Sequence, residues 1–393
     1  MQTVKLSDVC TIVSGSTPKT DEPAFWNGTL KWVTPAELRD DTIFVTDTER
    51  HITEAAARSA HLTPFPAGTV LLSSRAPIGK TAIAGAEMYC NQGFKNLICS
   101  DRINNRYLYY FLTSRTRYLN DLGRGATFKE ISKTIVENIE IPLPPLAEQQ
   151  RIVRELQQVG ALLANRRQVD EQLAELPKAR FVEMFGDLAF NPHGWKSIPI
   201  ADLCAASDDI KCGPFGTQLS QSEYITSGVP VWGIPQVNAN FQLPTKDFIT
   251  SEKAKKLSSY TLIPGDIVMS RKGNVGRCAV YPQNFPFGIL HSDVLRIRVN
   301  REVCDPTFLM QQLHDSRVVQ TQIEVISNGA IMAGLNVTKL KSLCVHLPPL
   351  PAQRRFAAFA RACAAQRAAC ARQIAVLETL RGKLLQDAFG AAG

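Results

Sequence analysis

The stretch Ile139–Val153, "IEIPLPPLAEQQRIV", places three prolines in an apolar, strand-like run and follows them with a helix-favouring polar segment. Proline fixes its own φ, lacks a backbone N–H and pushes the preceding residue into an extended conformation. We therefore predict a stiff extended corner at Leu143-Pro144-Pro145. From Glu148 no helix breaker occurs until Pro177, so a helix is expected over about 148–176.

The same corner occurs again at Cys344–Ala357, "CVHLPPLPAQRRFA". A shift of 204 residues superimposes the two Leu-Pro-Pro-Leu corners without a gap. It also aligns Gly125-Ala126 with Gly329-Ala330, Thr134 with Thr338, Gln149 with Gln353, Arg151 with Arg355, and Phe185-Gly186 with Phe389-Gly390. Self-similarity with a period of this length indicates a duplicated domain and not a solenoid.

A weaker echo lies upstream of each corner. Residues 67–83, "AGTVLLSSRAPIGKTAI", resemble 264–280, "PGDIVMSRKGNVGRCAV", with one residue inserted. Short apolar runs at Thr69–Leu72, Ile267–Met269 and Val294–Val299 are bounded by Gly, Pro and Asn, which predicts strands. Each half therefore reads as a β-rich domain, a short helical stretch, the proline corner and a long helix.

The two long helices carry apolar seams of the coiled-coil type. The first seam is Ile152, Leu156, Val159, Leu163, Val169, Leu173 and Leu176; the second is Phe356, Phe359, Cys363, Cys370, Leu377, Leu380 and Leu384. Two matching helices in one chain most simply pack against each other, and the alternative is two unrelated surface helices. A helix over 148–176 would be ~43 Å long, on the order of one turn of B-DNA.

Composition narrows the class of protein without naming it. The 393 residues are 45% apolar and carry a net charge of +8, which suits two globular domains and allows a polyanionic partner. The charge is uneven, because residues 351–393 are strongly basic while 1–140 are nearly balanced. No apolar run is long enough for a membrane helix, no signal pattern opens the chain, and the ten cysteines are scattered. We expect a cytoplasmic protein.

Together these features resemble the specificity (S) subunit of Type I restriction-modification systems. The order of globular domain, L-P-P-L-x-x-Q-x-R corner and long helix, repeated once, carries the likeness. Residues 14–38, "SGSTPKTDEPAFWNGTLKWVTPAEL", and 91–98, "NQGFKNLI", resemble parts of a target recognition domain. Residues 212–238, "CGPFGTQLSQSEYITSGVPVWGIPQVN", resemble the opening of a second, divergent one.

The resemblance implies an α+β fold with two β-rich, pseudo-twofold-related target recognition domains separated by two long antiparallel coiled-coil helices. We place the first recognition domain at 1–145, the central helix at 146–186, the second domain at 187–349 and the C-terminal helix at 350–393. In this family each domain reads one half of a bipartite double-stranded DNA target, and the helices set the unread spacer. The helices also dock two modification (methyltransferase) subunits.

The resemblance also implies a chain without catalytic residues. S-adenosylmethionine is expected in the modification subunits, and ATP and Mg in the restriction subunits that join the complex for phage defence. Asn191-Pro192-His193 and Asp305-Pro306-Thr307 lack the second proline and the aromatic residue of a methyltransferase motif. Residues 74–81, "SRAPIGKT", nearly spell a phosphate loop, but Ser74 replaces its first glycine. The six histidines show no metal-ligand spacing.

Candidate DNA contacts lie in loops bounded by Gly and Pro, because Lys and Arg bind phosphates while Arg, Asn and Gln read base edges. In the first domain they are Thr17, Lys19, Arg75, Lys80, Gln92 and Lys95. In the second they are Gln218, Gln236, Arg271, Lys272, Asn274 and Arg277. For any one of them, an ordinary solvated-surface role is the competing interpretation.

Candidate contacts to the modification subunits lie at the proline corners. They are Leu146, Gln149, Arg151, Leu350, Gln353, Arg354 and Arg355, with Arg361 and Arg367 further along the second helix. Arginine is favoured at interfaces, where its fork pairs with carboxylates of a partner. Two other functions stay open: a DNA-binding regulator without enzyme partners, and a self-sufficient DNA methyltransferase or nuclease.

Overall fold

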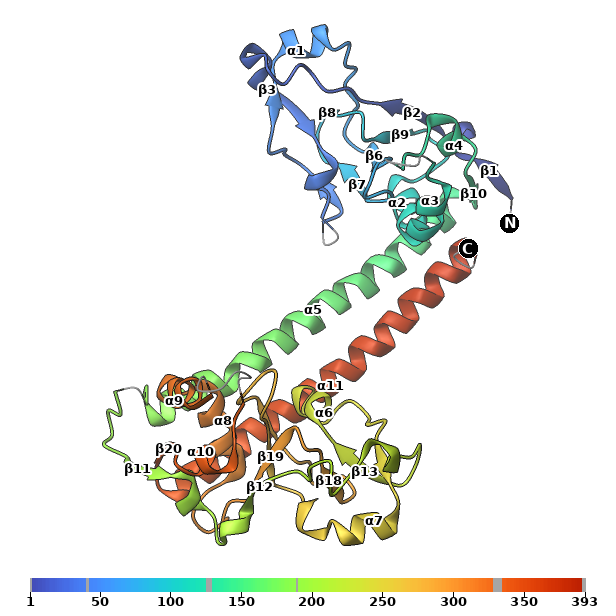
Figure 1. Cartoon of the computed structure of the whole chain (residues 1–393). Helices are drawn as coiled ribbons and strands as arrows, with labels where there is room; N and C mark the ends of the chain where they lie inside the picture. Colours follow the sequence, from blue (N-terminus) through green and yellow to red (C-terminus); the bar gives the residue numbers. More distant parts are fainter. Residues whose placement is uncertain (1, 40–41, 125–128, 189, 328–333, 391–393) are drawn as a thin grey trace. The chain divides into compact units, whose positions relative to one another are not determined.

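The computed structural model of the chain describes residues 2–39, 42–124, 129–188, 190–327 and 334–390 (Figure 1). The chain divides into two compact units, each with a hydrophobic core of its own. Unit 1 comprises Met1–Arg167 with Arg372–Gly393, and unit 2 comprises Gln168–Ala371. The repeated Gly-Ala pairs at 125–126 and 329–330 lie outside the described residues.

Unit 1 is built on a five-stranded sheet of order β2-β9-β6-β7-β4 and a three-stranded sheet of order β5-β3-β8. A third, two-stranded sheet joins the first strand of the unit to the strand before the proline corner. The strands are β1 (Thr3–Lys5), β2 (Cys10–Ser14), β3 (Trp26–Val33), β4 (Phe44–Val45), β5 (His51–Ile52), β6 (Val70–Leu72), β7 (Thr81–Ala84), β8 (Tyr89–Cys90), β9 (Lys95–Cys99) and β10 (Glu140–Pro142). The helices are α1 (Glu54–Ser59), α2 (Asn105–Ser114), α3 (Thr116–Leu122) and α4 (Lys133–Glu137).

Unit 2 repeats this plan, with sheets of order β12-β19-β16-β17 and β14-β13-β18-β15 and the pair β11-β20. Its strands are β11 (Lys196–Pro199), β12 (Ile210–Cys212), β13 (Val229–Trp232), β14 (Phe248–Ile249), β15 (Thr261–Leu262), β16 (Ile267–Ser270), β17 (Cys278–Val280), β18 (Gly288–Leu290), β19 (Val294–Ile297) and β20 (Cys344–Leu347). Its helices are α6 (Ile234–Asn238), α7 (Ser251–Lys256), α8 (Pro306–Asp315), α9 (Arg317–Ser327) and α10 (Val337–Lys341). The strands predicted at 69–72, 267–269 and 294–299 are thus present, each within a residue or two of its predicted bounds.

The two central hairpins, β6–β7 and β16–β17, correspond without any insertion. Val70 pairs with Ile83, and Ile267 pairs with Val280, so one shift of 197 residues relates both strands of the hairpin. The prediction that an alignment of 67–83 with 264–280 needs one inserted residue is therefore wrong. The difference between this shift and the 204 residues at the corners is taken up downstream of the hairpin.

Two 40-residue helices follow the proline corners: α5 (Leu146–Phe185) and α11 (Leu350–Phe389). Each ends in the repeated Phe-Gly pair. Gly186 and Gly390 have φ of 73° and 78°, the left-handed conformation that commonly follows a helix C-terminus. The two phenylalanines are buried: Phe185 in the core of unit 2 and Phe389 in the core of unit 1.

Within each unit the helices run antiparallel. In unit 1, Ile152 and Leu156 near the start of α5 share a core with Phe389 at the end of α11. In unit 2, Phe181 near the end of α5 lies 5.2 Å, centroid to centroid, from Phe356 near the start of α11. The α+β fold class, with β-rich units and long antiparallel helices, is confirmed.

Two details of the helix prediction are wrong. The first helix does not stop before Pro177 but runs through it to Phe185. Proline removes one intrahelical hydrogen bond, a cost of ~3 kcal/mol, and the burial of Phe181 and Phe185 among other aromatic rings offsets it. The predicted seams also include Leu176 and Leu380, but both side chains are exposed, at 43% and 42%.

Candidate nucleic-acid interface

The β6–β7 hairpin of unit 1 presents a loop held in one shape by its own backbone. Ser73 N donates to Lys80 O at 2.8 Å, and Gly79 N donates to Ser73 O at 3.0 Å. Gly79 has a φ of 90°, a value that side-chain-bearing residues rarely adopt. Because this loop joins two antiparallel strands, it lacks the strand–loop–helix context of a phosphate-binding loop.

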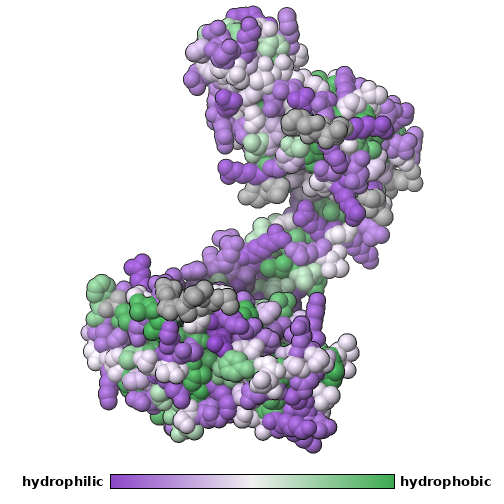
Figure 2. Space-filling model, in the orientation of Figure 1, coloured by the Kyte–Doolittle hydropathy of each residue, from purple (hydrophilic) through white to green (hydrophobic). Residues whose placement is uncertain are grey.

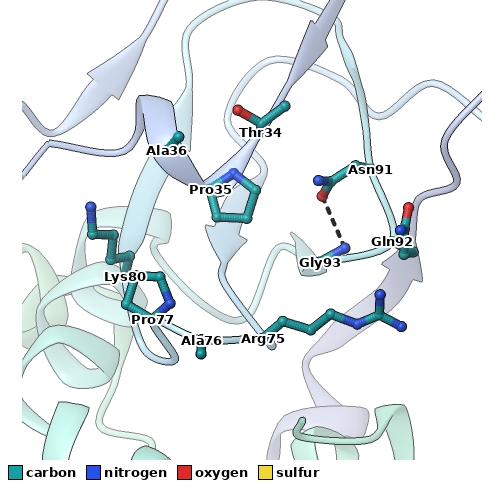
Figure 3. A pocket seen from close by; sticks show the side chains of 10 residues that line it. All are labelled: Thr34, Pro35, Ala36, Arg75, Ala76, Pro77, Lys80, Asn91, Gln92 and Gly93. Atoms are coloured by element: carbon teal, nitrogen blue, oxygen red, sulfur yellow. Dashed lines mark hydrogen bonds between the residues drawn. The ribbon is translucent and has the colours of Figure 1, made fainter. Parts of the chain in front are cut away.

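A pocket of about 410 Å³ opens beside this loop (Figure 3). It is lined by Thr34, Pro35, Ala36, Arg75, Ala76, Pro77, Lys80, Asn91, Gln92 and Gly93. Ser74 N donates to Gly93 O at 2.7 Å, which ties the β6–β7 loop to the β8–β9 loop. Three of the six predicted contacts of the first domain, from two segments of the sequence, therefore line one pocket.

The other three predicted residues of unit 1 are placed differently. The Thr17 hydroxyl donates to Oε1 of Gln92, so Thr17 belongs to the rim of the pocket. Lys19 is exposed, and its carbonyl accepts a hydrogen bond from Nε1 of Trp26. Lys95 is only 7% exposed, and its ammonium donates to Oε1 of Glu130 at 3.1 Å. Lys95 therefore acts as an internal ion-pair partner and not as a phosphate contact.

Glu130 links two of the predicted cations. Its second oxygen, Oε2, accepts from Nε of Arg75 at 2.9 Å. Partial burial by itself would raise the pKa of Glu130, but the hydrogen bonds and charges of Lys95 and Arg75 outweigh it and hold that pKa below its usual value. The carboxylate is therefore ionised at neutral pH.

Lys80 lines the pocket mainly with the aliphatic part of its side chain, and its charged end is bonded elsewhere. Its ammonium donates to the carbonyl of Leu38 at 2.9 Å. In Figure 3 the ammonium end of Lys80 points away from Gln92. Arg75 extends toward the Gln92 side of the pocket, so these two residues are the better placed to meet a ligand.

The β16–β17 hairpin of unit 2 repeats the loop of unit 1. Ser270 N donates to Arg277 O at 2.7 Å, Gly276 N donates to Ser270 O at 3.1 Å, and Gly276 has a φ of 85°. Arg271 N donates to Asp293 O at 3.1 Å and so ties the hairpin to the β18–β19 loop. The predicted residues Arg271, Lys272, Asn274 and Arg277 all lie on this one loop.

The cations of this loop are partly held by neighbouring groups. Lys272 Nζ lies 2.7 Å from Oδ1 of Asp293. Arg271 donates through Nη1 to the thiol of Cys212 at 3.0 Å, and its guanidinium lies 5.6 Å from the ring centroid of Phe215. Phe215 is 54% exposed, so an aromatic face stands at the surface beside the arginine. Arginine and exposed aromatic rings together suit nucleic-acid bases.

Of the two predicted glutamines of unit 2, Gln218 lies at the surface and Gln236 lies in the interior. Gln218 is exposed, and its Oε1 accepts from the hydroxyl of Tyr260 at 2.9 Å. Gln236 is 7% exposed, accepts from Gly233 N and donates to Pro244 O. Its amide closes a turn inside unit 2, so the structure gives Gln236 an architectural role in place of base contact.

The repeated glutamine of each proline corner is completely buried. Oε1 of Gln149 accepts from Asn104 N at 2.8 Å, and Nε2 donates to the carbonyls of Arg102 and Pro144. Gln353 makes the matching set with Asp305 N, Val303 O and Pro348 O. Each glutamine thus fastens the start of a long helix to the N-cap residue of α2 or α8. Neither side chain reaches the surface, so neither is available to contact a partner.

The remaining corner residues are at the surface or partly buried. Leu146 is 42% exposed and lines an open groove of about 830 Å³ with Gln2, Asp101, Arg102, Leu143, Pro144, Pro145 and Glu148. Arg151 is bonded to Glu148 and Glu155 of its own helix at 2.6 Å each. Leu350 is partly buried, Arg355 is exposed, and Arg354 donates to the carbonyl of Arg301 at 3.0 Å.

Arg361 and Arg367 are predicted from the sequence to pair with a partner, but both have acidic neighbours inside unit 2. Arg361 lies 3.5 Å from Asp305, and Arg367 lies 3.0 Å from Asp170. Exposed apolar side chains remain on the helices in unit 1, at Leu162, Val376 and Leu380. Figure 2 shows apolar residues interspersed among hydrophilic ones along α5 and α11.

Sequence reasoning missed several members of the site. Asn91 and Thr34 were overlooked although Asn91 directly precedes Gln92. Nothing in the local sequence marks Glu130 or Asp293 as part of the site, because only the tertiary fold brings each carboxylate to its cation. Among the described residues there is no group of three or more His, Cys, Asp or Glu side chains arranged to hold a metal. Within the same residues, no helix is both long and apolar enough to span a membrane.

A family model described as the Type I restriction modification DNA specificity domain matches residues 1–175 and again 192–374. The chain is 27% identical to the Type I restriction enzyme MjaIX specificity subunit of Methanocaldococcus jannaschii, over 97% of this chain and 90% of that protein. It is 26% identical to the EcoR124I/EcoR124II specificity subunit of Escherichia coli, over 45% of each chain.

Two solved structures support the fold. The S subunit of a Type I restriction-modification system from M. genitalium matches with a TM-score of 0.63 at 15% identity, over 99% of this chain and 96% of that chain. A chain from a structural study of complex assembly in the type I R-M system matches with a TM-score of 0.54 at 20% identity, over 100% of this chain and 98% of that one.

Proposed function

The chain belongs to the family of Type I restriction-modification DNA specificity subunits, and on this basis we propose that each of its units reads one half of a bipartite double-stranded DNA target. The observation that carries this proposal is the repeated hairpin loop. In each unit a loop of the same length and backbone hydrogen bonding brings cations to the end of the equivalent hairpin. Two equivalent reading loops in one chain suit a target with two separate halves.

Nine residues remain as proposed DNA contacts once Lys80, Lys95 and Gln236 are assigned to internal bonding. They are Thr17, Lys19, Arg75 and Gln92 in unit 1, and Gln218, Arg271, Lys272, Asn274 and Arg277 in unit 2. Arg75, Gln92, Arg271 and Asn274 can donate to base edges in the major groove. Lys19, Lys272 and Arg277 are suited to phosphates, which position a protein without reading sequence.

Methyl transfer and cleavage are assigned to partner subunits. S-adenosylmethionine is then held by two modification subunits, and ATP and Mg by restriction subunits, so this chain supplies sequence recognition alone. The complex is placed in the cytoplasm, where it meets DNA. This location agrees with ten cysteines that are all free thiols.

The modification subunits are proposed to dock near the proline corners, one to each unit, and the helices to set the spacer. The groove beside Leu146 in unit 1 and the exposed Arg355 in unit 2 support docking at these places. The exposed Leu162, Val376 and Leu380 extend the apolar surface along the helices. A helix of 40 residues is about 60 Å long, which is long enough to span more than one turn of B-DNA.

Domain exchange tests the proposal. Residues 1–140 are replaced by the first recognition domain of another family member, and the methylated sites are mapped by sequencing in cells that also express the modification subunit. We expect one half of the target to change while the other half stays the same. The matched exchange of residues 187–349 should change the opposite half. Alteration of both halves by either exchange would contradict the proposal.

A further inference from the structure

The two hairpin loops carry cations at equivalent positions, and each cation is paired with a carboxylate. Arg75 and Lys272 are related by the 197-residue shift that relates the strands of the hairpins. Arg75 is bonded to Glu130 at 2.9 Å, and Lys272 to Asp293 at 2.7 Å. The carboxylates come from unrelated places in the two units, so the pairing is not a by-product of one repeated segment.

Arg75 uses only one edge of its guanidinium in this pair. Its Nε donates to Oε2 of Glu130, and the side chain remains 46% exposed. A guanidinium carries five donors in a planar fork, and the two terminal amino groups face away from Nε. In Figure 3 that end of Arg75 extends along the pocket toward Gln92. The geometry leaves a bidentate donor presented in a fixed plane.

Glu130 is itself fixed at several points. Its Oε1 accepts from Lys95, whose side chain is 9% exposed. Its backbone N and O each form a 3.0 Å hydrogen bond with Arg124, and the next residue, Ile131, donates to the carbonyl of Ser74 in the hairpin loop. A carboxylate so anchored cannot follow a mobile arginine, and therefore determines where the guanidinium lies.

We propose that Arg75 reads a guanine in the first half of the target and that Glu130 is the residue that positions it. This inference rests on the proposed function and names the chemistry of one contact. Guanine offers O6 and N7 as two acceptors on its major-groove edge, the pattern that a bidentate arginine fits best. Glu130 is shared with Lys95, so its negative charge offsets part of the positive charge of Arg75. This partial offset weakens attraction to phosphates of any sequence and favours base-specific contact.

The experiment uses the full-length chain assembled with its modification subunit and a double-stranded DNA library with randomised positions. Bound DNA is sequenced for the wild type and for R75K, E130Q and E130D. R75K keeps the charge and loses the fork, so preference for guanine at one position of one half should fall by about ten-fold or more. E130Q should relax the same position while total DNA affinity is retained or increased, and E130D should restore part of the preference.

A matched control lies in unit 2, where D293N should affect only the other half of the target. If R75K and E130Q leave every base preference unchanged, Arg75 contacts phosphate only and the inference is wrong. An equal loss of preference at all positions in E130Q would show a merely structural role and would also overturn it. If the wild type selects no bipartite sequence, the proposed function itself fails, which is a distinguishable result.

Discussion

Gln149 and Gln353 were predicted to contact a partner subunit, but in the structure both stabilise the fold by bonding to backbone groups. Both follow a Leu-Pro-Pro-Leu corner, and both use their amide on one backbone N–H and two carbonyls. Backbone groups that are buried need partners, and a proline-rich corner offers few N–H donors of its own. The repeat is therefore explained by folding, without any partner.

Replacing Gln149 with alanine should destabilise unit 1. The change leaves the buried N–H of Asn104 and two carbonyls without their partner, at a cost of about 1–3 kcal/mol. Urea unfolding followed by circular dichroism would measure the shift in midpoint. Gln150, the exposed neighbour, is the matched control, and Q150A should change stability by less than about 0.5 kcal/mol. Equal effects from the two variants would refute the fastening role.

His314 makes unit 2 sensitive to mild acid. Burial, reinforced by the charge of Arg277, lowers the pKa of His314 from its usual 6.5 to about 4. The unfolded chain therefore binds this proton at a higher pH than the folded chain does. Stability is fully present above pH 6.5 and falls as the pH drops toward 4, by on the order of 3 kcal/mol.

The H314Q variant isolates this titration. Glutamine can still accept the hydrogen bond that Cys278 N donates to Nε2 of His314, but it does not ionise. We expect the stability of wild type minus variant to decline between pH 6.5 and 4, measured by urea midpoints at each pH. A difference that is constant over this range would show that folding does not lower the pKa of His314.

At the same scale, the sequence predicted some of the site and not the rest. Arg75 and Gln92 were identified because loops bounded by Gly and Pro are exposed, and their residue types suit base edges. Lys95 was misplaced, because charge alone does not reveal that the strand carrying it is buried. Glu130 could not be predicted, because it lies 55 residues after Arg75 in the sequence and only the tertiary fold brings the two side chains together.

Among the elements, local rules predicted the strands and the corners well, but the helix-breaker rule at Pro177 made the first long helix too short. Proline fixed the corner, because the restriction it imposes acts on its own and the preceding residue. At Pro177 the same rule failed, since the helix is held on the far side by the packing of Phe181 and Phe185, which is tertiary. Leu176 is exposed, and the buried stripe of α5 resumes at Phe181.

Glycine-to-alanine substitution should act in opposite directions in two elements of unit 1. G79A forces a φ of 90° on alanine and brings its Cβ to 3.1 Å from Thr116, at a cost of about 1–2 kcal/mol or more. G160A lies inside α5, where a Cβ would meet nothing within 4 Å, and should stabilise by up to about 1 kcal/mol. Thermal unfolding of both variants measures the signs. A stabilising G79A would mean that the hairpin loop has no fixed shape.

At the scale of the whole molecule, duplication is the feature that the sequence revealed most completely. The repeat of about 204 residues, the two proline corners and the two Phe-Gly helix ends could be identified by comparing the sequence with itself. Such a comparison does not depend on knowing the local structure. Differences between the copies are also visible in the sequence, but the structure is needed to show which side chains they leave paired. Arg151 is held by Glu148 and Glu155, whereas the matching positions around Arg355 are Ala352 and Phe359.

This difference predicts that the two docking surfaces are unequal in charge. Arg355 is exposed, and among the described residues its side chain makes no hydrogen bond or ion pair, so it is free to meet a carboxylate of a modification subunit. Arg151 is already bonded to two carboxylates, so these three side chains together are net negative and offer no free cation. R355E should therefore weaken docking at unit 2 by about ten-fold, the effect of placing like charges together. R151A should change docking at unit 1 far less.

Native mass spectrometry of the assembled complex measures this directly. We expect the wild type to hold two modification subunits and R355E to release one of them first, with a loss that shrinks as salt is raised because exposed charges are screened. Arg354 is left intact in this test, since its bond to the carbonyl of Arg301 belongs to the fold. Circular dichroism of the variant alone controls for folding. If R355E keeps both modification subunits at physiological salt, Arg355 lies outside the docking surface and the asymmetry has no bearing on assembly.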